Sequence, residues 1–190
     1  HTLHAGKVDK GNLAINCQYC HSSAEKSKHA GIPSTNVCMN CHQAVGEGRT
    51  PEGTKEIAKI YAAVGWDAAT LKYTGKTEPV KWVKVHNLPD HAYFNHAQHV
   101  AVGKIECQEC HGPIDEKMDV AEQWAPLTMG WCIKCHAEKD VKMAGNGYYD
   151  EIMARLEDSD MGHEELKKYL DDEKISVKEL GGWECSKCHY

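Results

Sequence analysis

This chain of 190 residues is short of the residues that build an ordinary apolar core. It contains one Phe, aromatic residues make up 7% of it, and its mean hydropathy is −0.60. With so little large apolar surface to bury, we expect the conventional core to be thin. The sequence also has no apolar run of about 20 residues, the length that a membrane-spanning helix needs.

The chain also has no excess of basic residues. Lys and Arg number 22 against 28 Asp and Glu, and the net charge is −6. Proteins that bind nucleic acids need a basic face to meet the phosphates. The charge balance therefore argues against a nucleic-acid partner.

Paired cysteines, by contrast, are abundant. Ten cysteines form five Cys-x-x-Cys pairs, and a histidine directly follows each pair. The cysteines are Cys17 and Cys20, Cys38 and Cys41, Cys107 and Cys110, Cys132 and Cys135, and Cys185 and Cys188; the histidines are His21, His42, His111, His136 and His189. Thiols at this spacing can reach the two vinyl groups of one porphyrin, and the next imidazole binds the iron. The motifs predict five haem c groups, with these cysteines as thioether anchors and these histidines as proximal ligands.

Other uses of Cys-x-x-Cys fit less well. A zinc ribbon pairs two such knuckles per metal and does not require the following histidine. A thioredoxin-like site has one pair beside a βαβ pattern, and structural disulfides do not need this regularity. Covalent haem attachment takes place outside the cytoplasm, so we expect the bacterial periplasm or its equivalent.

Five porphyrins would replace the missing side-chain core. We therefore expect short α-helices and long loops wrapped around the haems, with little sheet, as in a multihaem cytochrome c. Two halves share the order His-x-x-His, motif, motif, which indicates an internal repeat. The predicted parts are a first dihaem module (1–45), a connecting helix and extended segment (46–91), a second dihaem module (92–137), an acidic helical insertion (138–184) and the fifth motif (185–190).

Local patterns predict four elements between the motifs. Thr54 to Val64 has helical spacing, with Thr54 as the expected N-cap. Lys81 to Pro89 alternates like a short strand. In the acidic insertion, YYDEIMARL and GHEELKKYL have helical spacing. The insertion is interpreted as a solvated surface or as a landing site for a basic redox partner.

The remaining histidines bear on function, because a filled sixth position confines a haem to electron transfer and an open one allows chemistry on a small molecule. Two residues three apart lie near one face of a helical turn, so one His-x-x-His pair can serve two neighbouring irons. Met118, Met129 and Met143 are interpreted as packing residues, although one His/Met haem is an alternative. The predicted distal ligands are His1, His4, His96 and His99 from the two pairs, and His86, with His91 as the runner-up for the fifth position; His29 and His163 are expected at the surface.

The stretch FNHAQHVAVGKIECQECH resembles the small multihaem cytochromes of the c3/c7 type. In those proteins the first histidine of F-x-His-x-x-His serves the haem of the next motif. The wider context, GWDAATLKYTGKTEPVKWVKVHNLPDHAYFNHAQHV followed by LTMGWCIKCH, resembles the pentahaem cytochrome c subunit of alternative complex III. The resemblance covers Ala5 to His136, and the fifth motif fits the haem number of that family.

That resemblance implies an electron-transfer subunit of a membrane-bound quinol-oxidising complex, with no substrate chemistry of its own. The implied partners are an iron–sulfur protein of the molybdopterin-oxidoreductase type, integral membrane quinol-binding subunits, and a monohaem cytochrome c or a haem–copper oxidase. The implied location is the periplasmic face of the bacterial inner membrane. The chain begins on His1 and stops one residue after His189, so we expect both ends to be cut and a membrane anchor to lie upstream.

Three alternatives remain open at the level of sequence. A multihaem reductase of nitrogen or sulfur oxyanions needs one open haem, and the surplus of histidines counts against it. A haem subunit of another quinone-linked complex would use the same haem chemistry with reversed electron flow. The direction does not follow from the sequence, because reduction potentials depend on burial and partners. A scaffold with a structural metal is the third.

Overall fold

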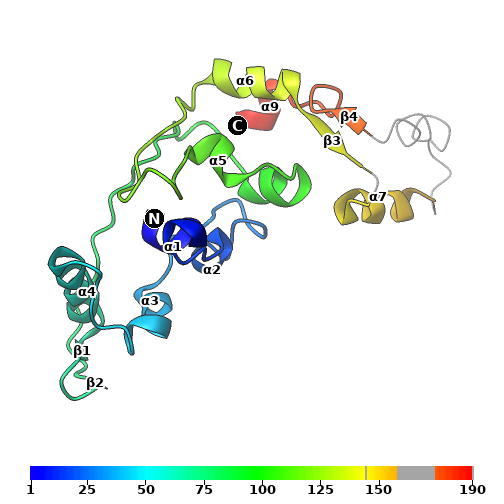
Figure 1. Ribbon diagram of the computed structural model, residues 1–190. Helices are drawn as coiled ribbons and strands as arrows, with labels where there is room; N and C mark the ends of the chain where they lie inside the picture. Colours follow the sequence, from blue (N-terminus) through cyan, green and yellow to red (C-terminus); the bar gives the residue numbers. More distant parts are fainter. Residues whose placement is uncertain (144, 158–173, 190) are drawn as a thin grey trace. The chain divides into compact units, whose positions relative to one another are not determined.

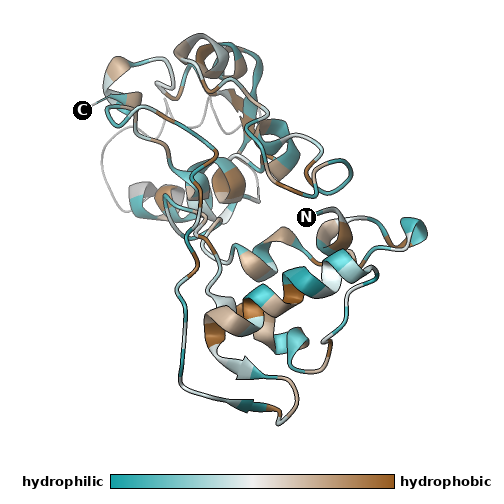
Figure 2. Cartoon of the chain, turned by 90° about the vertical axis from the view of Figure 1, so that its left-hand side faces the viewer, coloured by the Kyte–Doolittle hydropathy of each residue, from teal (hydrophilic) through white to brown (hydrophobic). Residues whose placement is uncertain are grey.

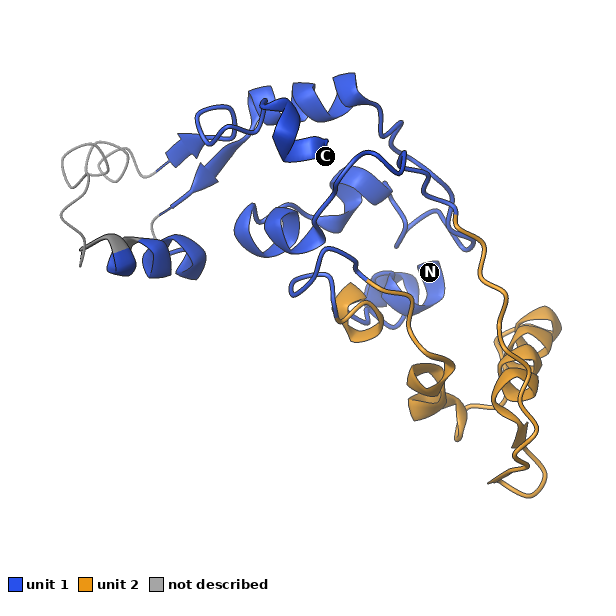
Figure 3. Cartoon of the chain, turned by 180° about the vertical axis from the view of Figure 1, so that it is seen from behind, with its two compact units in different colours: residues 1–16, 23–30, 85–190 blue, residues 17–22, 31–84 orange. Residues whose placement is uncertain are grey.

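The computed structural model describes residues 1–143, 145–157 and 174–189. The chain divides into two compact units (Figure 3). Unit 1 comprises His1–Asn16, Ser23–Ala30 and Val85–Tyr190, and unit 2 comprises Cys17–Ser22 and Gly31–Lys84. Short helices and long connections make up most of both units, with two small sheets of two strands each (Figure 1). The predicted mixture of short helices and loops with little sheet is thus confirmed; the division into dihaem modules stays a prediction.

Unit 2 holds the first two Cys-x-x-Cys-His motifs. Its elements are α2 (Cys17–Cys20), α3 (Thr35–His42), α4 (Pro51–Val64), β1 (Trp66–Asp67) and β2 (Lys72–Tyr73). The strands β1 and β2 are antiparallel, with Trp66 opposite Tyr73. Helix α4 supports α3, because the Tyr61 hydroxyl donates a hydrogen bond of 2.6 Å to the His42 carbonyl. The longest helix of the described chain therefore holds the end of the second motif in place.

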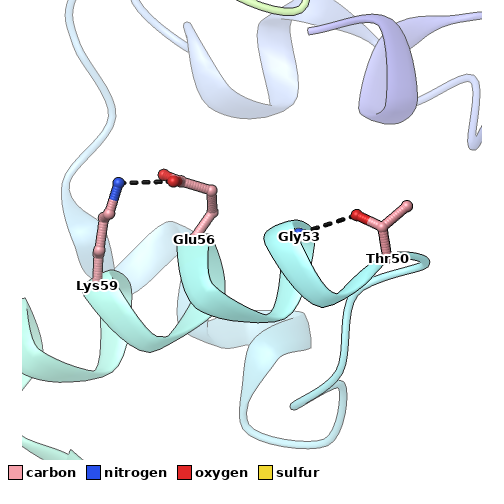
Figure 4. A network of polar contacts seen from close by, with 4 residues as sticks. All are labelled: Thr50, Gly53, Glu56 and Lys59. Carbon is pink, nitrogen blue, oxygen red and sulfur yellow. Dashed lines mark hydrogen bonds and ion pairs between the residues drawn. The ribbon is translucent and has the colours of Figure 1, made fainter.

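Helix α4 confirms the helix predicted at Thr54 to Val64, but it begins three residues earlier (Figure 4). Thr50 is the N-cap, since its hydroxyl accepts a hydrogen bond of 3.1 Å from the Gly53 N–H. Pro51 follows at the first helical position, where its missing N–H costs nothing. The prediction of Thr54 as N-cap was wrong, because a threonine and a proline upstream form a better start signal.

Replacing Thr50 by Ala should lower the free energy of unfolding by about 1 kcal/mol, since the Gly53 N–H loses its partner. The exposed Thr77 offers a matched Thr→Ala control outside any helix. Guanidinium unfolding of both variants measures the difference. Equal denaturation midpoints for Thr50→Ala and the control variant would show that the Thr50 cap adds no stability.

The strand predicted at Lys81 to Pro89 is not formed, which is the second correction. From Val80 to Val85 the backbone makes no hydrogen bond within the part of the chain that the structure describes. Figure 2 shows this stretch as a single extended trace. Alternating side chains favour an extended backbone, but a ladder also requires a neighbouring strand.

Unit 1 holds the other three motifs. It contains α1 (Thr2–Ala5), the 3₁₀ turn η1 (Val8–Lys10), the π-helical turn η2 (Gln98–Val102), α5 (Cys107–His111), α6 (Met129–Glu138), β3 (Asp140–Lys142), α7 (Gly147–Glu157), β4 (Lys174–Ser176) and α9 (Cys185–Cys188). Helix α7 confirms the helix predicted for YYDEIMARL. The second predicted helix of the acidic insertion, GHEELKKYL, lies outside the described residues.

The small apolar core of unit 1 lies around the antiparallel pair of strands β3 and β4. Val141 is opposite Ile175, and both pack with Met143. Tyr149 and Val177 cover this cluster. Met143 therefore has the packing role that was predicted for it.

Buried side chains are few across the described residues, whereas many large apolar side chains are exposed. Met39 alone is almost completely inaccessible, at 1% exposure, while Trp82 and Trp124 are 57% and 58% exposed. The expected thin core is confirmed. Large apolar rings bound at the Cys-x-x-Cys-His motifs would supply the missing buried surface. No helix in the described ranges combines the length and the apolar character needed to cross a membrane.

Candidate haem sites

Each Cys-x-x-Cys pair lies on one helical turn, in α2, α3, α5, α6 and α9. Residues three apart in a helix face the same side, so the two thiols of a pair point in a common direction. The following histidine stays on the same turn: the His21 N–H bonds to the Cys17 carbonyl and the His189 N–H to the Cys185 carbonyl. No disulfide joins any of the ten cysteines. Two thiols and an imidazole on one turn are the donor set that covalent haem attachment requires.

Burial raises the pKa values of thiols in several pairs. It raises the pKa of Cys110 to about 11. It also raises the pKa values of Cys20 and Cys132. A protonated, partly buried thiol is inert toward solvent.

Backbone carbonyls orient most of the motif histidines through Nδ1. Because a carbonyl oxygen only accepts, Nδ1 carries the proton and Nε2 keeps its lone pair for a metal. The distances from Nδ1 are 2.7 Å for His21 to Gly31, 2.9 Å for His42 to Val45, 2.8 Å for His136 to Gly182 and 3.3 Å for His189 to His91. This arrangement is typical of imidazoles that ligate metals, and it fits four of the five predicted proximal ligands.

The His-x-x-His pair of the second half shows the same tautomer control. His96 Nδ1 donates to the Lys28 carbonyl at 2.9 Å, and His99 Nδ1 donates to the Asn95 carbonyl at 2.8 Å. Phe94, the one phenylalanine of the chain, stacks on His99 with ring centroids 4.4 Å apart and meets His96 edge-on at 4.8 Å. Burial lowers the pKa of His99, which favours the neutral imidazole that a metal needs.

Two motif histidines face a second histidine at a separation that suits one iron. Metal–imidazole bonds of about 2 Å put two ligand rings on opposite sides of a metal about 6 Å apart, centre to centre. The rings of His99 and His136 are 6.0 Å apart and inclined by 27°. Those of His91 and His189 are 5.5 Å apart and inclined by 28°. Both separations come near that distance at the fourth and fifth motifs, and the stacked rings of each pair must turn before both Nε2 atoms point at one iron.

The pair at the third motif is closer than an iron between the rings allows. His86 and His111 have centroids 4.5 Å apart at 76°, and His86 Nε2 lies 3.1 Å from His111 Nδ1. One of the two rings must turn before both can ligate one iron. His86 and His91 were alternatives for one distal position, but each lies beside a different motif histidine.

The first His-x-x-His pair lies at the start of unit 1. His4 belongs to α1, and His1 precedes it as the N-cap residue. Backbone bonds from Leu13 to the Leu3 carbonyl and from Ile15 to the His4 carbonyl hold this helix in place. The ligand role of His1 and His4 stays a prediction. The resemblance implies that His96 serves the haem of the next motif, which ends at His111. The structure places His86 beside His111, and the assignment of His96 to that haem stays a prediction.

The predicted methionines differ in surroundings. Met118 and Met143 are 4% and 6% exposed, whereas Met129 is 61% exposed at the start of α6. Across the described residues, no cluster of three or more His, Cys, Asp and Glu side chains gathers as in a structural metal site. Thiol pairs that are each followed by their own histidine fit haem better than a tetrahedral zinc site.

Sequence reasoning missed the carbonyls that hold the imidazoles. Gly182 reaches His136 across 46 residues, and the His91 carbonyl reaches His189 across 98 residues. Such long-range contacts leave no local pattern in the sequence. Gly31 and Gly182 come closest to a signal in the sequence, because a loop that passes close to an imidazole ring must carry a small side chain there.

Gly112, directly after the third motif, has a conformation reserved for glycine. Its φ of 65° and ψ of −162° fall in a region that other residues essentially never adopt. A Cβ there would also come within 2.4 Å of the Trp124 ring. We therefore expect Gly112→Ala to lower the free energy of unfolding by about 2–3 kcal/mol.

Gly130 in α6 is the matched control, because a Cβ at that position meets nothing within 4 Å. Gly130→Ala should be neutral or stabilising by up to about 1 kcal/mol. Guanidinium unfolding measures both variants. If Gly112→Ala unfolds at the same denaturant concentration as Gly130→Ala, the tight approach of Trp124 is not a constraint on the fold.

No family model matches the chain. It is 25% identical over 183 residues to the menaquinone reductase multihaem cytochrome c subunit of Nitratidesulfovibrio vulgaris, a match that covers 96% of this chain and 64% of the relative. It is also 26% identical over 121 residues to the methionine–tRNA ligase of Thermococcus kodakarensis, covering 58% of this chain and 16% of the ligase. The chain thus spans just under two thirds of the first relative, and a similarity to a multihaem cytochrome c subunit agrees with the donor sets described above.

Proposed function

We propose that this chain is a multihaem c-type cytochrome that carries electrons as a subunit of a quinone-linked membrane complex. The observation that carries this proposal is the set of Cys-x-x-Cys-His turns whose imidazoles are held by Nδ1, with a second imidazole facing the fourth and fifth of them. Similarity to a cytochrome subunit of a menaquinone reductase supports the quinone-linked setting. When bound, each haem c supplies a one-electron couple at its iron.

The protein groups define what such a site can do. The thiol pairs anchor the ring edge, and the carbonyls of Gly31, Val45 and Gly182 fix the tautomer and orientation of the proximal imidazoles. Where a second imidazole fills the sixth position, small molecules are excluded from the iron. At the fourth and fifth motifs, these groups suit electron transfer.

In its finer form, the proposal is the pentahaem subunit of an alternative complex III type of quinol-oxidising complex. It carries five haems and lies on the periplasmic face of the bacterial inner membrane. Its partners are an iron–sulfur protein of the molybdopterin-oxidoreductase type, quinol-binding membrane subunits, and a monohaem cytochrome c or haem–copper oxidase. The second candidate is a quinone-reducing complex with the opposite electron flow, which the menaquinone reductase relative favours.

Membranes that contain the native complex distinguish the two candidates. In one arm, a reduced quinol is added and reduction of the chain's haems is followed by absorbance. In the other arm, a reduced soluble cytochrome c is the donor and quinol formation is measured. Quinol-driven haem reduction that precedes cytochrome c reduction supports the alternative complex III type, and quinol formation supports the second candidate. If neither donor reduces these haems in active membranes, the quinone-linked proposal is wrong.

A further inference from the structure

The extended stretch Val80 to Val85 has the character of a strand without a partner. Its backbone N–H and C=O groups make no hydrogen bond within the described ranges of the chain. Val83 is 79% exposed and Trp82 is 57% exposed. Valine and tryptophan favour strands, and an extended backbone with open hydrogen-bonding groups can accept a further strand.

Residues 72–86 carry a net positive charge, whereas the chain as a whole is acidic. Residues 72–86 contain four lysines, Lys72, Lys76, Lys81 and Lys84, and one acidic residue, Glu78. The whole chain has a net charge of −6. A basic stretch on an acidic protein favours a partner that carries carboxylates.

A second copy of the chain is a poor partner for the same stretch. An antiparallel pair of identical Val80 to Val85 segments, centred between Trp82 and Val83, would place Lys81 opposite Lys84 twice. Like charges directly opposite each other destabilise a ladder. The lysines therefore favour pairing with a different protein over self-pairing.

We propose that Val80 to Val85 is a docking strand, which pairs with an acidic edge strand of another protein by β-strand addition. Main-chain hydrogen bonds supply the attraction, while Lys81 and Lys84 select carboxylates on the incoming strand. Trp82 and Val83 lose their exposure in the process. This inference goes beyond the proposed function and does not depend on which residues ligate the haems.

Amide hydrogen exchange of the full haem-loaded chain tests this proposal. The probe is a synthetic eight-residue peptide of Val with two Glu residues three positions apart, the spacing that places one Glu opposite Lys81 and the other opposite Lys84. We expect the amides of Val80 to Val85 to exchange rapidly alone and slowly with the peptide. The same peptide with Lys in place of Glu should bind on the order of tenfold more weakly, since two favourable charge pairs become repulsive. A peptide methylated on every backbone nitrogen has no N–H donor on either edge and should not protect.

Two proline variants of the chain test the two hydrogen-bonding edges of the docking strand. Val83→Pro removes a donor on one edge and Trp82→Pro removes a donor on the other, and neither residue makes a backbone bond that the fold would lose. At least one of them should abolish protection, and Lys81→Glu should weaken binding about tenfold. Thr77→Ala serves as the neutral control.

Several results would overturn the proposal. They are absence of protection at Val80 to Val85, equal protection by the methylated or the Lys peptide, and full binding by both proline variants. Protection that rises with chain concentration in the absence of peptide would assign the stretch to self-association. Protection by phosphatidylglycerol vesicles and not by the Glu peptide would assign it to a membrane surface.

Discussion

Replacing His99 by Ala should convert one low-spin haem of the chain into a high-spin haem that binds carbon monoxide. His99 lies 6.0 Å from His136 between ring centroids, and its Nδ1 is held by the Asn95 carbonyl, so Nε2 is the atom left for the predicted ligation. Alanine removes this ligand and leaves His136 as the sole protein ligand at the fourth motif. Electron paramagnetic resonance of the oxidised variant and carbon monoxide difference spectra of the reduced variant measure the change.

His29→Ala is the matched control, because that side chain is exposed in a loop of the same unit. We expect it to leave every haem low-spin. His96→Ala should open a different iron, since its ring is held in the same way by the Lys28 carbonyl. If His96→Ala and His99→Ala both stay low-spin and inert to carbon monoxide, the His-x-x-His pair does not ligate iron.

Replacing both Cys185 and Cys188 by Ala should remove one haem of five and leave the other four. The two thiols lie on α9, and the next residue, His189, faces His91. Without thioether anchors the fifth haem is not covalently attached, although the other motifs are intact. Intact mass under denaturing conditions and the pyridine haemochrome count measure this loss directly.

The exposed Ser186 lies between the two cysteines and provides the control Ser186→Ala, which should retain five haems. In the double cysteine variant, His91 should also lose the haem that we expect it to share with His189. If the double variant keeps five covalent haems, the fifth motif is not an attachment site. If the control variant also loses one, the helix rather than the thiols governs attachment.

Local features were predictable because they depend on adjacent residues. The five motifs, α4 and α7 follow from spacing within one or a few helical turns. The predicted N-cap of α4 was wrong because the helix starts at Thr50 and Pro51, upstream of the stretch in which apolar residues recur with helical spacing. A strand at Lys81 to Pro89 was wrong because alternation says nothing about whether a second strand is present.

The pairing of histidines depends on contacts between distant parts of the chain. His86 and His91 were indistinguishable in sequence, since both lie in one loop-like stretch before prolines or aromatics. The structure separates them, with His86 beside His111 and His91 beside His189. The hydrogen bond from His136 Nδ1 to the Gly182 carbonyl could not be predicted from the sequence either, because 46 residues separate the two.

Electron paramagnetic resonance of the oxidised, purified chain, with haem counted on the same sample, tests the central claim most directly. We expect five haems per chain, all of them low-spin, because the histidines outnumber the irons and at least two motif imidazoles already face a second one. Such a spectrum means an electron carrier with closed irons. A stoichiometric high-spin haem would contradict this and indicate a reductase with an open iron.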